Sequence, residues 1–282
     1  MPFGAAVWST SRNNMLDYPA AAFIRFCDNH GLLKLVGRPQ WRTVSGGSQC
    51  YVYLAQSAIE SNGGTILAGT GASSVTRSGD GVSVVLSDGS QIHADQVVIA
   101  THANTALSLL NDPSNEEDAL LSVFEYDQNR AVLHSDDSLM PKRRKAWCSW
   151  NYVEQENDDT AQVTVTYWMN RLQNLTTERN YLVSLNPGVE PETNTVVREA
   201  VYEHPIFKAA TWRSQQLLWS LQGVNKTWFC GNYFGAGFHE DAVQAGFAVA
   251  EQLGGKDRPW SLENPSERIV VTGENAKDQS AL

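Results

Sequence analysis

Cysteine is scarce in this chain, and a long apolar run is missing altogether. The 282 residues hold four cysteines with no C-x-x-C pair and no metal-ligand spacing. Three of them stand beside aromatic or aliphatic residues, as buried thiols do. No run approaches the ~20 apolar residues that cross a bilayer, and the start lacks a charged segment followed by an apolar one. We therefore expect no metal site, no transmembrane segment and a cytoplasmic protein.

Basic residues are also in the minority. The chain has 21 Lys and Arg against 31 Asp and Glu, a formal net charge of -10. Nucleic acids and anionic membrane surfaces both attract a basic face, so this balance argues against either partner. One basic cluster runs from Pro141 to Lys145. It is interpreted as a solvated turn or, alternatively, as a contact for a cofactor phosphate or an anionic substrate.

Several catalytic and cofactor motifs are absent. No G-x-S-x-G is found, so hydrolase chemistry has no support. No histidine pair has the spacing of a metal site. No G-x-G-x-x-G is found either, although that turn carries the pyrophosphate at a helix N-terminus in dinucleotide-binding folds. With 42% hydrophobic residues, the chain is nevertheless globular and long enough for one or two domains.

The most informative segment that is present runs from Thr227 to Gln252. A short apolar strand stops at Gly231, and Gly235 and Gly237 then lead into a helix. Such a turn directs backbone N–H groups and a helix N-terminus at an electron-rich ligand, so it predicts an anion-binding or cofactor site. The alternative is a tightly packed strand-to-helix junction. Small residues form one face of the predicted helix: Ala242, Ala245, Gly246, Val249 and Ala250.

A second segment has a recognisable order of elements. Gly46 and Gly47 precede a helical pattern at residues 51–61. Asp-Gly pairs near residues 80 and 88 are the turn chemistry that hairpins prefer. Strands are predicted at residues 65–68, 73–76, 81–86, 91–94 and 95–100.

Together these segments resemble the FAD-dependent amine oxidase superfamily, which includes amine oxidases, protoporphyrinogen oxidases and carotenoid desaturases. Within it, the chain is most similar to bacterial proteins described as predicted NAD/FAD-binding or amine oxidase-like. The family's strand ending AD-x-V-I-x-A-T stands here as Ala94 to Thr101. The resemblance runs from about Phe3 to Gly254 but covers only the later part of the family's length. It therefore suggests a truncated gene product or, alternatively, a protein whose first half comes from another chain.

The resemblance implies FAD as the cofactor. Gly231 and Asn232 would lie at the ribityl chain, although the family more often has an acid at the position of Asn232. Phe238 and His239 are the candidate catalytic residues, and Phe238 stands where amine oxidases generally have Tyr or Trp. The implied cofactor contacts are Ala72, Ala100, Thr101, Gly231, Asn232, Gly237, Glu240, Asp241, Ala242 and Val243.

The remaining residues are divided into interleaved lobes. We predict a helical part of the substrate lobe at 1–40, FAD-lobe segments at 41–110 and 223–255, a substrate lobe at 111–222 and a flexible tail at 256–282. Substrate-lobe strands are expected at 129–134, 146–153 and 162–168, with an acidic turn at 155–159. Their tryptophans would either line a pocket over the flavin or fill the core. His134 could face that pocket, and His204 is placed in a loop.

The predicted fold is mixed α/β: a partial FAD-binding doubly wound lobe plus a β-sheet substrate lobe with helices. The predicted function is an FAD-dependent oxidoreductase that transfers hydride from a small or lipid-like organic substrate to the flavin. The alternative is a non-catalytic fragment of such an enzyme that does not retain FAD, because the phosphate-binding turn is missing.

Overall fold

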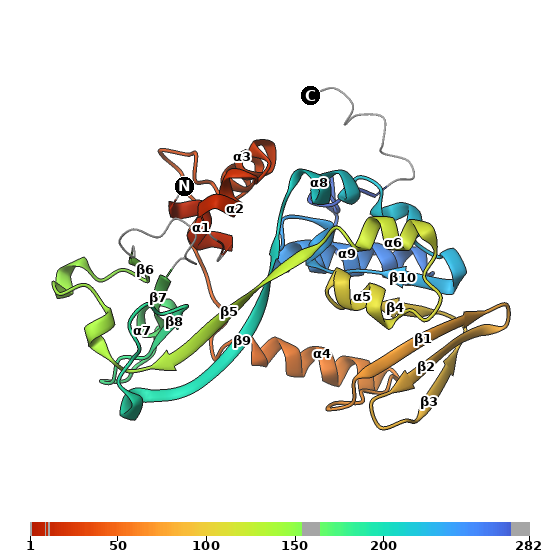
Figure 1. Ribbon diagram of the computed structural model, residues 1–282, viewed down its shortest axis with the longest axis horizontal. Helices are drawn as coiled ribbons and strands as arrows, with labels where there is room; N and C mark the ends of the chain where they lie inside the picture. The colour runs from red at the N-terminus through yellow and green to blue at the C-terminus, as the bar shows by residue number, and fades with distance from the viewer. Residues whose placement is uncertain (1, 9, 11, 154–163, 272–282) are drawn as a thin grey trace. The chain divides into compact units, whose positions relative to one another are not determined.

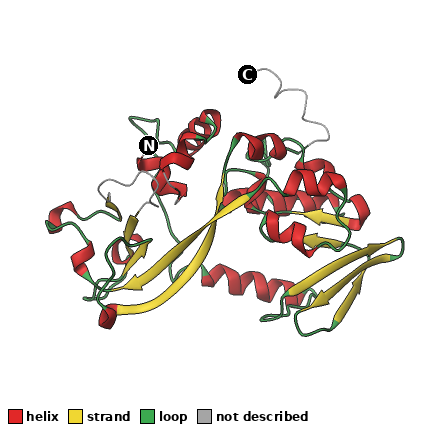
Figure 2. Ribbon diagram, viewed as in Figure 1, coloured by secondary structure: helices red, strands yellow, loops and turns green. Residues whose placement is uncertain are grey.

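The computed structural model describes residues 2–8, 10, 12–153 and 164–271 (Figure 1). The chain forms two compact units. Unit 1 comprises Met1–Leu67 and Tyr126–Ile206, and unit 2 comprises Ala68–Glu125 and Phe207–Leu282. Both contain helices and strands, which confirms the predicted mixed class (Figure 2). The unit boundaries near residues 67, 125 and 206 differ from those predicted at 40, 110 and 222.

Unit 1 is built on an antiparallel five-stranded sheet with strand order β6-β7-β8-β5-β9. Its polar centre is a buried chain of hydrogen bonds from His134 through Ser184 to Thr166. A separate cluster of rings, Trp8 with Tyr18 and Phe26, joins the first helices. The elements are α1 Pro2–Trp8, α2 Arg12–Leu16, α3 Ala20–Asn29, α4 Gln49–Ser61, β5 Glu125–His134, β6 Trp150–Val153, β7 Thr164–Trp168, α7 Met169–Leu172, β8 Leu182–Leu185 and β9 Val196–Ile206.

The strand predictions for unit 1 were incomplete. The strand expected at 146–153 begins at Trp150, because residues 144–146 form a 3₁₀ turn. Strands β8 and β9 were not predicted, and His204 lies within β9 rather than in a loop. The acidic turn predicted at 155–159 lies outside the described residues.

Unit 2 contains two small sheets. The predicted hairpins form an antiparallel meander, β1-β2-β3, and β4 pairs in parallel with β10. The strand predicted at 65–68 is absent: these residues have no strand partner, and Ile66 and Leu67 are exposed. The elements are β1 Ala72–Ser78, β2 Gly81–Leu86, β3 Gln91–Ala94, β4 Val97–Ile99, α5 Ala103–Leu109, α6 Asn115–Leu121, α8 Ala209–Gln215, β10 Thr227–Phe229 and α9 His239–Gln252.

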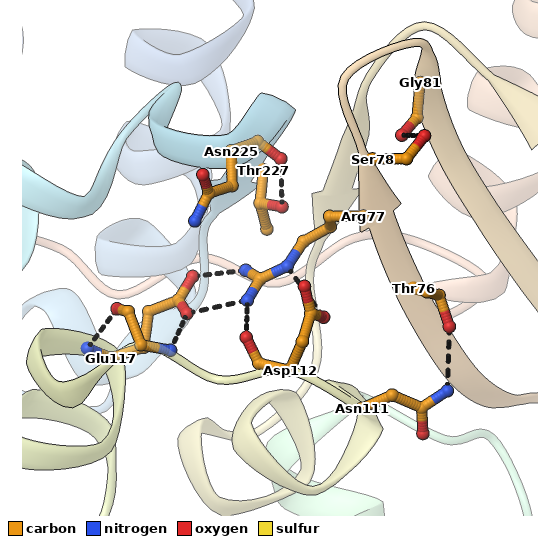
Figure 3. A network of polar contacts seen from close by, with 10 residues as sticks. Thr76, Arg77, Ser78, Gly81, Asn111, Asp112, Glu117, Asn225 and Thr227 are labelled. Carbon is orange, nitrogen blue, oxygen red and sulfur yellow. Dashed lines mark hydrogen bonds and ion pairs between the residues drawn. The ribbon is translucent and has the colours of Figure 1, made fainter.

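A buried ion-pair network joins β1 of this meander to α6 (Figure 3). The Arg77 guanidinium donates to both carboxylate oxygens of Glu117, at 2.5 and 2.9 Å, and to Asp112. Glu117 also accepts from the Ser114 backbone N–H at 2.7 Å. Because a buried charge is tolerated only when it is paired, this network fixes α6 against the meander.

The first part of the predicted flexible tail, residues 256–271, makes contacts with α9. Arg258 pairs with Glu251 at 2.9 Å, and Arg268 pairs with Asp241 at 2.7 Å. Ile269 is buried. Residues 256–271 therefore pack against α9, while 272–282 lie outside the described residues.

The sequence predicts neither a transmembrane segment nor a metal site, and the structure can be searched for both only within the described residues. In that part of the chain no helix combines the length and the apolar character needed to cross a bilayer. No group of three or more metal-ligating side chains is found there either. The cysteine prediction was wrong in one respect: Cys27 and Cys230 are buried, but Cys50 and Cys148 are exposed.

Candidate functional site

A pocket lies where the two parallel strands of unit 2 end. Thr227 lies opposite Val97 and Phe229 opposite Ile99, so β10 and β4 reach their carboxyl ends at the same edge. Clefts at this edge of parallel strands are the usual ligand sites of α/β folds. The pocket has a volume of about 580 Å³ and is lined by Ala100, Thr101, His102, Thr105, Gly231, Asn232, Phe238, His239 and Ala242.

Gly231 allows the backbone to turn at the end of β10. A Cβ atom there would lie 2.8 Å from the Tyr233 ring and 3.3 Å from the Thr101 carbonyl oxygen. Tyr233 is fully buried, so its ring cannot move aside. Because Gly231 has no side chain, the two turns of the pocket, one after β4 and one after β10, can lie close together.

Hydrogen bonds within the next turn fix its shape. The Gly237 N–H donates to the Asn232 carbonyl at 3.2 Å, and the Asn232 side-chain amide donates to the Gly237 carbonyl at 3.1 Å. Gly237 has a φ of 90°, a conformation that favours glycine. At Gly235 a Cβ would lie 2.6 Å from Cγ of Asp241, so this glycine lets the turn pack on the start of α9.

The start of α9 is held by Asp241. One carboxylate oxygen of this residue accepts from the Phe238 N–H at 2.7 Å, and the other accepts from Nε of Arg268 at 2.7 Å. Asp241 is 1% exposed and is not part of the pocket lining. Its negative charge is thus neutralised away from the pocket, and the positive end of the α9 dipole remains beside the lining residues.

The pocket brings together seven of the residues singled out in the sequence. Five predicted cofactor contacts line it: Ala100, Thr101, Gly231, Asn232 and Ala242; both candidate catalytic residues, Phe238 and His239, do so too. The other predicted contacts lie outside the lining: Ala72, Gly237, Glu240, Asp241 and Val243. Of these, Ala72 is the first residue of β1 and is exposed.

His102 and Thr105 also line the pocket but were not predicted. His102 directly follows Thr101 and is the N-cap residue of α5, and Thr105 lies in the first turn of that helix. A polar residue immediately after a strand and before a helix was the signal that could have found them. With His239, they give the pocket two imidazoles and a hydroxyl group beside one aromatic ring.

His134 does not face this pocket. It is fully buried at the end of β5, where Nε2 lies 2.9 Å from the Ser184 hydroxyl and Nδ1 accepts from the Asp136 N–H. Burial lowers the pKa of His134 below its ordinary value. It is therefore a neutral core residue within unit 1.

The tryptophans and the basic cluster of unit 1 pack on one another. Trp147 is buried and contacts Trp168 edge-to-face at 5.2 Å. The Arg144 guanidinium lies 3.7 Å from the centre of the Trp147 ring, a cation–π contact. Trp150, in contrast, is exposed and contacts Tyr167. Trp147 and Trp168 thus belong to the core of unit 1, which agrees with the interpretation that the tryptophans fill the core.

Comparison with known proteins supports a flavoprotein. Residues 20–128 match the family described as flavin containing amine oxidoreductase. This match includes the meander and β4 but ends before the Gly231 turn. The resemblance to FAD-dependent amine oxidases is confirmed, and the match supports FAD as the cofactor. No curated protein matches the sequence.

Comparison with solved structures shows a similar fold in putrescine oxidase. Putrescine oxidase bound to putrescine matches with a TM-score of 0.51 at 13% identity, over 74% of this chain and 53% of that one. A reduced UDP-galactopyranose mutase matches with a TM-score of 0.49 at 14% identity, over 77% and 54%. A fatty acid isomerase from P. acnes has a TM-score of 0.47 at 14% identity, over 65% and 47%. The chain thus spans about half the length of these proteins.

Proposed function

We propose that the pocket between β4 and β10 binds the flavin end of FAD and that the protein takes part in an FAD-dependent oxidation. The observation that carries the proposal is the meeting, in one pocket, of two turns that the sequence singled out independently. One turn follows β4 and the other follows β10. Residues 130 positions apart would not converge in this way by local chain geometry.

The residues present fit a flavin on physical grounds. A volume of about 580 Å³ lies within the range of cofactor and ligand pockets. The first turn of the 14-residue α9 borders it, and a helix N-terminus favours an electron-rich group. Phe238 offers an apolar face for a ring, and the Asn232 amide offers a hydrogen-bonding group.

Under this proposal, five of the lining residues have a role in holding the cofactor or in its chemistry. Asn232 and Thr101, both in the lining, would bind the polar ribityl and phosphate portion, and the small side chain of Ala242 would leave room for the ring. Phe238 would exclude water from the ring, and His239 is the group in the lining best suited to hold or move a proton. When bound, FAD would accept a hydride from a carbon–hydrogen bond of a small or lipid-like organic substrate.

Blocking the pocket tests the proposal. In Ala242→Phe a bulky ring replaces a small lining residue, so the affinity for FAD, measured by quenching of flavin fluorescence, should fall at least about tenfold, which corresponds to ~1.4 kcal/mol. The matched control is Ala250→Phe, because Ala250 lies on the same helix, is exposed and does not line the pocket. Equal affinities of the two variants for FAD would refute the proposed site.

The second candidate is a protein of this fold that does not retain FAD. It is supported by the absence of G-x-G-x-x-G from the sequence, because that turn normally carries the pyrophosphate. Under this alternative, titration with FAD gives no saturable signal even in the unmodified protein. Riboflavin, which lacks the diphosphate, separates the two cases: weak binding of riboflavin that Ala242→Phe abolishes would still place the ring in this pocket.

A further inference from the structure

We propose that Asn62, the residue that caps the C-terminal end of α4, is a site of spontaneous deamidation, and that its conversion to an acid opens the last turn of this helix. The inference is independent of the cofactor pocket. Three observations carry it: the Asn62-Gly63 pair in the sequence, the hydrogen bonds at the end of α4 and the exposure of the whole helix.

The sequence supplies the reactive pair. Asn62 is the only asparagine of the chain that is followed by glycine. In deamidation the backbone nitrogen of the following residue attacks Cγ of the asparagine side chain, and a Cβ on that residue would hinder the approach. Gly63 has no Cβ, and its φ of 85° is a conformation that glycine adopts readily. Both residues are exposed, so the water that completes the reaction reaches them.

The reaction has two steps and needs water as its only co-reactant. A bond forms between the Gly63 nitrogen and Cγ of Asn62, the bond from Cγ to the side-chain nitrogen breaks, and ammonia leaves with the proton of the Gly63 N–H. Water then adds to one of the two carbonyl carbons of the cyclic imide and opens the ring. Attack at the side-chain carbonyl gives aspartate, and attack at the backbone carbonyl gives isoaspartate.

Hydrogen bonds protect Asn62 while the last turn of α4 is closed. The side-chain amide of Asn62 donates to the Ala58 carbonyl at 2.7 Å. The Gly63 N–H donates to the Glu60 carbonyl at 3.0 Å, and Gly63 stands just beyond the cap, where helices commonly end in a left-handed residue. The attacking nitrogen and the leaving amide are thus both engaged, so the reaction requires that this turn open.

Packing does little to keep the turn closed. None of the 13 residues of α4 is buried, and Leu54 and Ile59 are 72% and 48% exposed. A helix of this length is marginal in water without tertiary packing, and unpacked helix ends open at little cost in free energy. Opening releases the Gly63 N–H and the Asn62 side chain together, and the two reactive groups then become free at the same moment.

The product works against closing the turn again. The new carboxylate cannot donate to the Ala58 carbonyl, and its negative charge lies at the C-terminal end of α4, where the helix dipole is also negative. Isoaspartate, in addition, lengthens the backbone by one methylene group, which displaces the Gly63 N–H from the Glu60 carbonyl. Deamidation therefore shortens the helix from this end.

Peptide mass spectrometry after incubation at neutral pH tests the site. We expect the peptide that contains Asn62 to gain the mass difference between an amide and an acid, as both aspartate and isoaspartate, at least about tenfold faster than the peptide that contains Asn174. Asn174 is the internal control, because it is also exposed but is followed by Leu175. In Asn62→Gln the side chain keeps its amide but would have to close a larger ring, so that peptide should stay unmodified.

Hydrogen exchange measures the effect on α4. Asn62→Asp carries the charge of the product, and the amides of residues 58–64 should exchange at least about threefold faster in this variant than in the unmodified protein. The matched control is Gln49→Glu, which adds the same charge at the other end of α4, where the dipole favours it, and should leave that exchange unchanged. Equal modification of Asn62 and Asn174 would overturn the proposal, and so would equal exchange of residues 58–64 in Asn62→Asp and Gln49→Glu.

Discussion

The first turns of α6 and α9 share one arrangement, an acid paired with an arginine, but the residues that cap the two helices differ. In each helix the third residue is an acid, Glu117 or Asp241, that accepts from the N-cap backbone N–H and pairs with an arginine. The N-cap residues differ. In α6 the Ser114 hydroxyl accepts from the Glu117 N–H at 3.1 Å and completes a capping box. In α9 the N-cap is Phe238, whose side chain has no acceptor.

The different N-cap residues, Ser114 in α6 and Phe238 in α9, indicate how the N-terminus of a helix becomes available to a ligand. At α6 the side-chain cap and the buried arginine satisfy the first turn from within the protein. At α9 the acid is turned away toward Arg268, and the residue that would otherwise cap the helix presents an apolar ring to the pocket. The positive end of the helix dipole is thus left for the pocket. The predictions below test whether the two starts differ in this way.

The largest effect is expected at α6. Glu117→Ala leaves the Arg77 guanidinium buried without its main partner, and breaking a buried ion pair in this way costs about 3–5 kcal/mol. Urea unfolding measures the loss, and Glu116→Ala, an exposed acid of the same turn, serves as the control. A loss below about 1 kcal/mol, the value of an exposed pair, would show that solvent reaches Arg77.

A smaller loss is expected at α9. Asp241→Ala removes the partner of Arg268, but that side chain is 13% exposed and can turn toward water, so we expect about 2–3 kcal/mol. Asp241→Asn keeps an acceptor for the Phe238 N–H and should lose about half as much. Urea unfolding with and without FAD measures both variants. If Asp241→Asn were as unstable as Asp241→Ala, the backbone bond would contribute nothing and the ion pair everything.

Acid should weaken the α6 arrangement. Burial alone would raise the pKa of Glu117, but the hydrogen bonds from Arg77 and Ser114 outweigh it and hold that pKa below its ordinary value of 4.5. A lowered carboxylate pKa gives stability that is present above the unfolded-state value and is lost as the pH falls through the folded-state value. The protein should therefore lose more stability between pH 5 and pH 3 than Glu117→Gln does. If the stability of the unmodified protein and that of Glu117→Gln fell in parallel with pH, Glu117 would not be the cause of the acid sensitivity.

Local sequence signals predicted much of unit 2. The Asp-Gly turns and β-branched runs predicted the meander, and the apolar run at residues 95–100 contained β4. The glycines around Gly231 predicted the turn of the pocket, because their conformational freedom is visible in the sequence. In contrast, β8 and β9 were missed. Much of β9 is exposed and its burial does not alternate along the strand, so its place depends on pairing with a distant strand.

The residues missed at the site depended on long-range packing. His102 and Thr105 enter the pocket because β4 pairs with β10, a contact between segments 130 residues apart. The pairing of Asp241 with Arg268 is not visible in the sequence for the same reason, because the polar composition after the last helix predicts a flexible tail. Sequence spacing identifies a turn, but it does not identify the partner that a distant side chain provides.

The smallest effect separates capping from ligand binding. Ser114→Ala removes the hydroxyl that accepts from the Glu117 N–H, and such a loss costs about 1 kcal/mol. Because Ser114 does not line the pocket, the affinity for FAD should not change. The reciprocal change, Phe238→Ser, introduces an acceptor at the start of α9. It should stabilise the helix by a similar amount but weaken FAD binding, since the ring is lost and the new hydroxyl competes for the N–H groups at the helix start. Thermal unfolding and flavin fluorescence give the two quantities. If Phe238→Ser bound FAD unchanged, the first turn of α9 would be a structural cap like that of α6, and the contrast between the two helices would disappear.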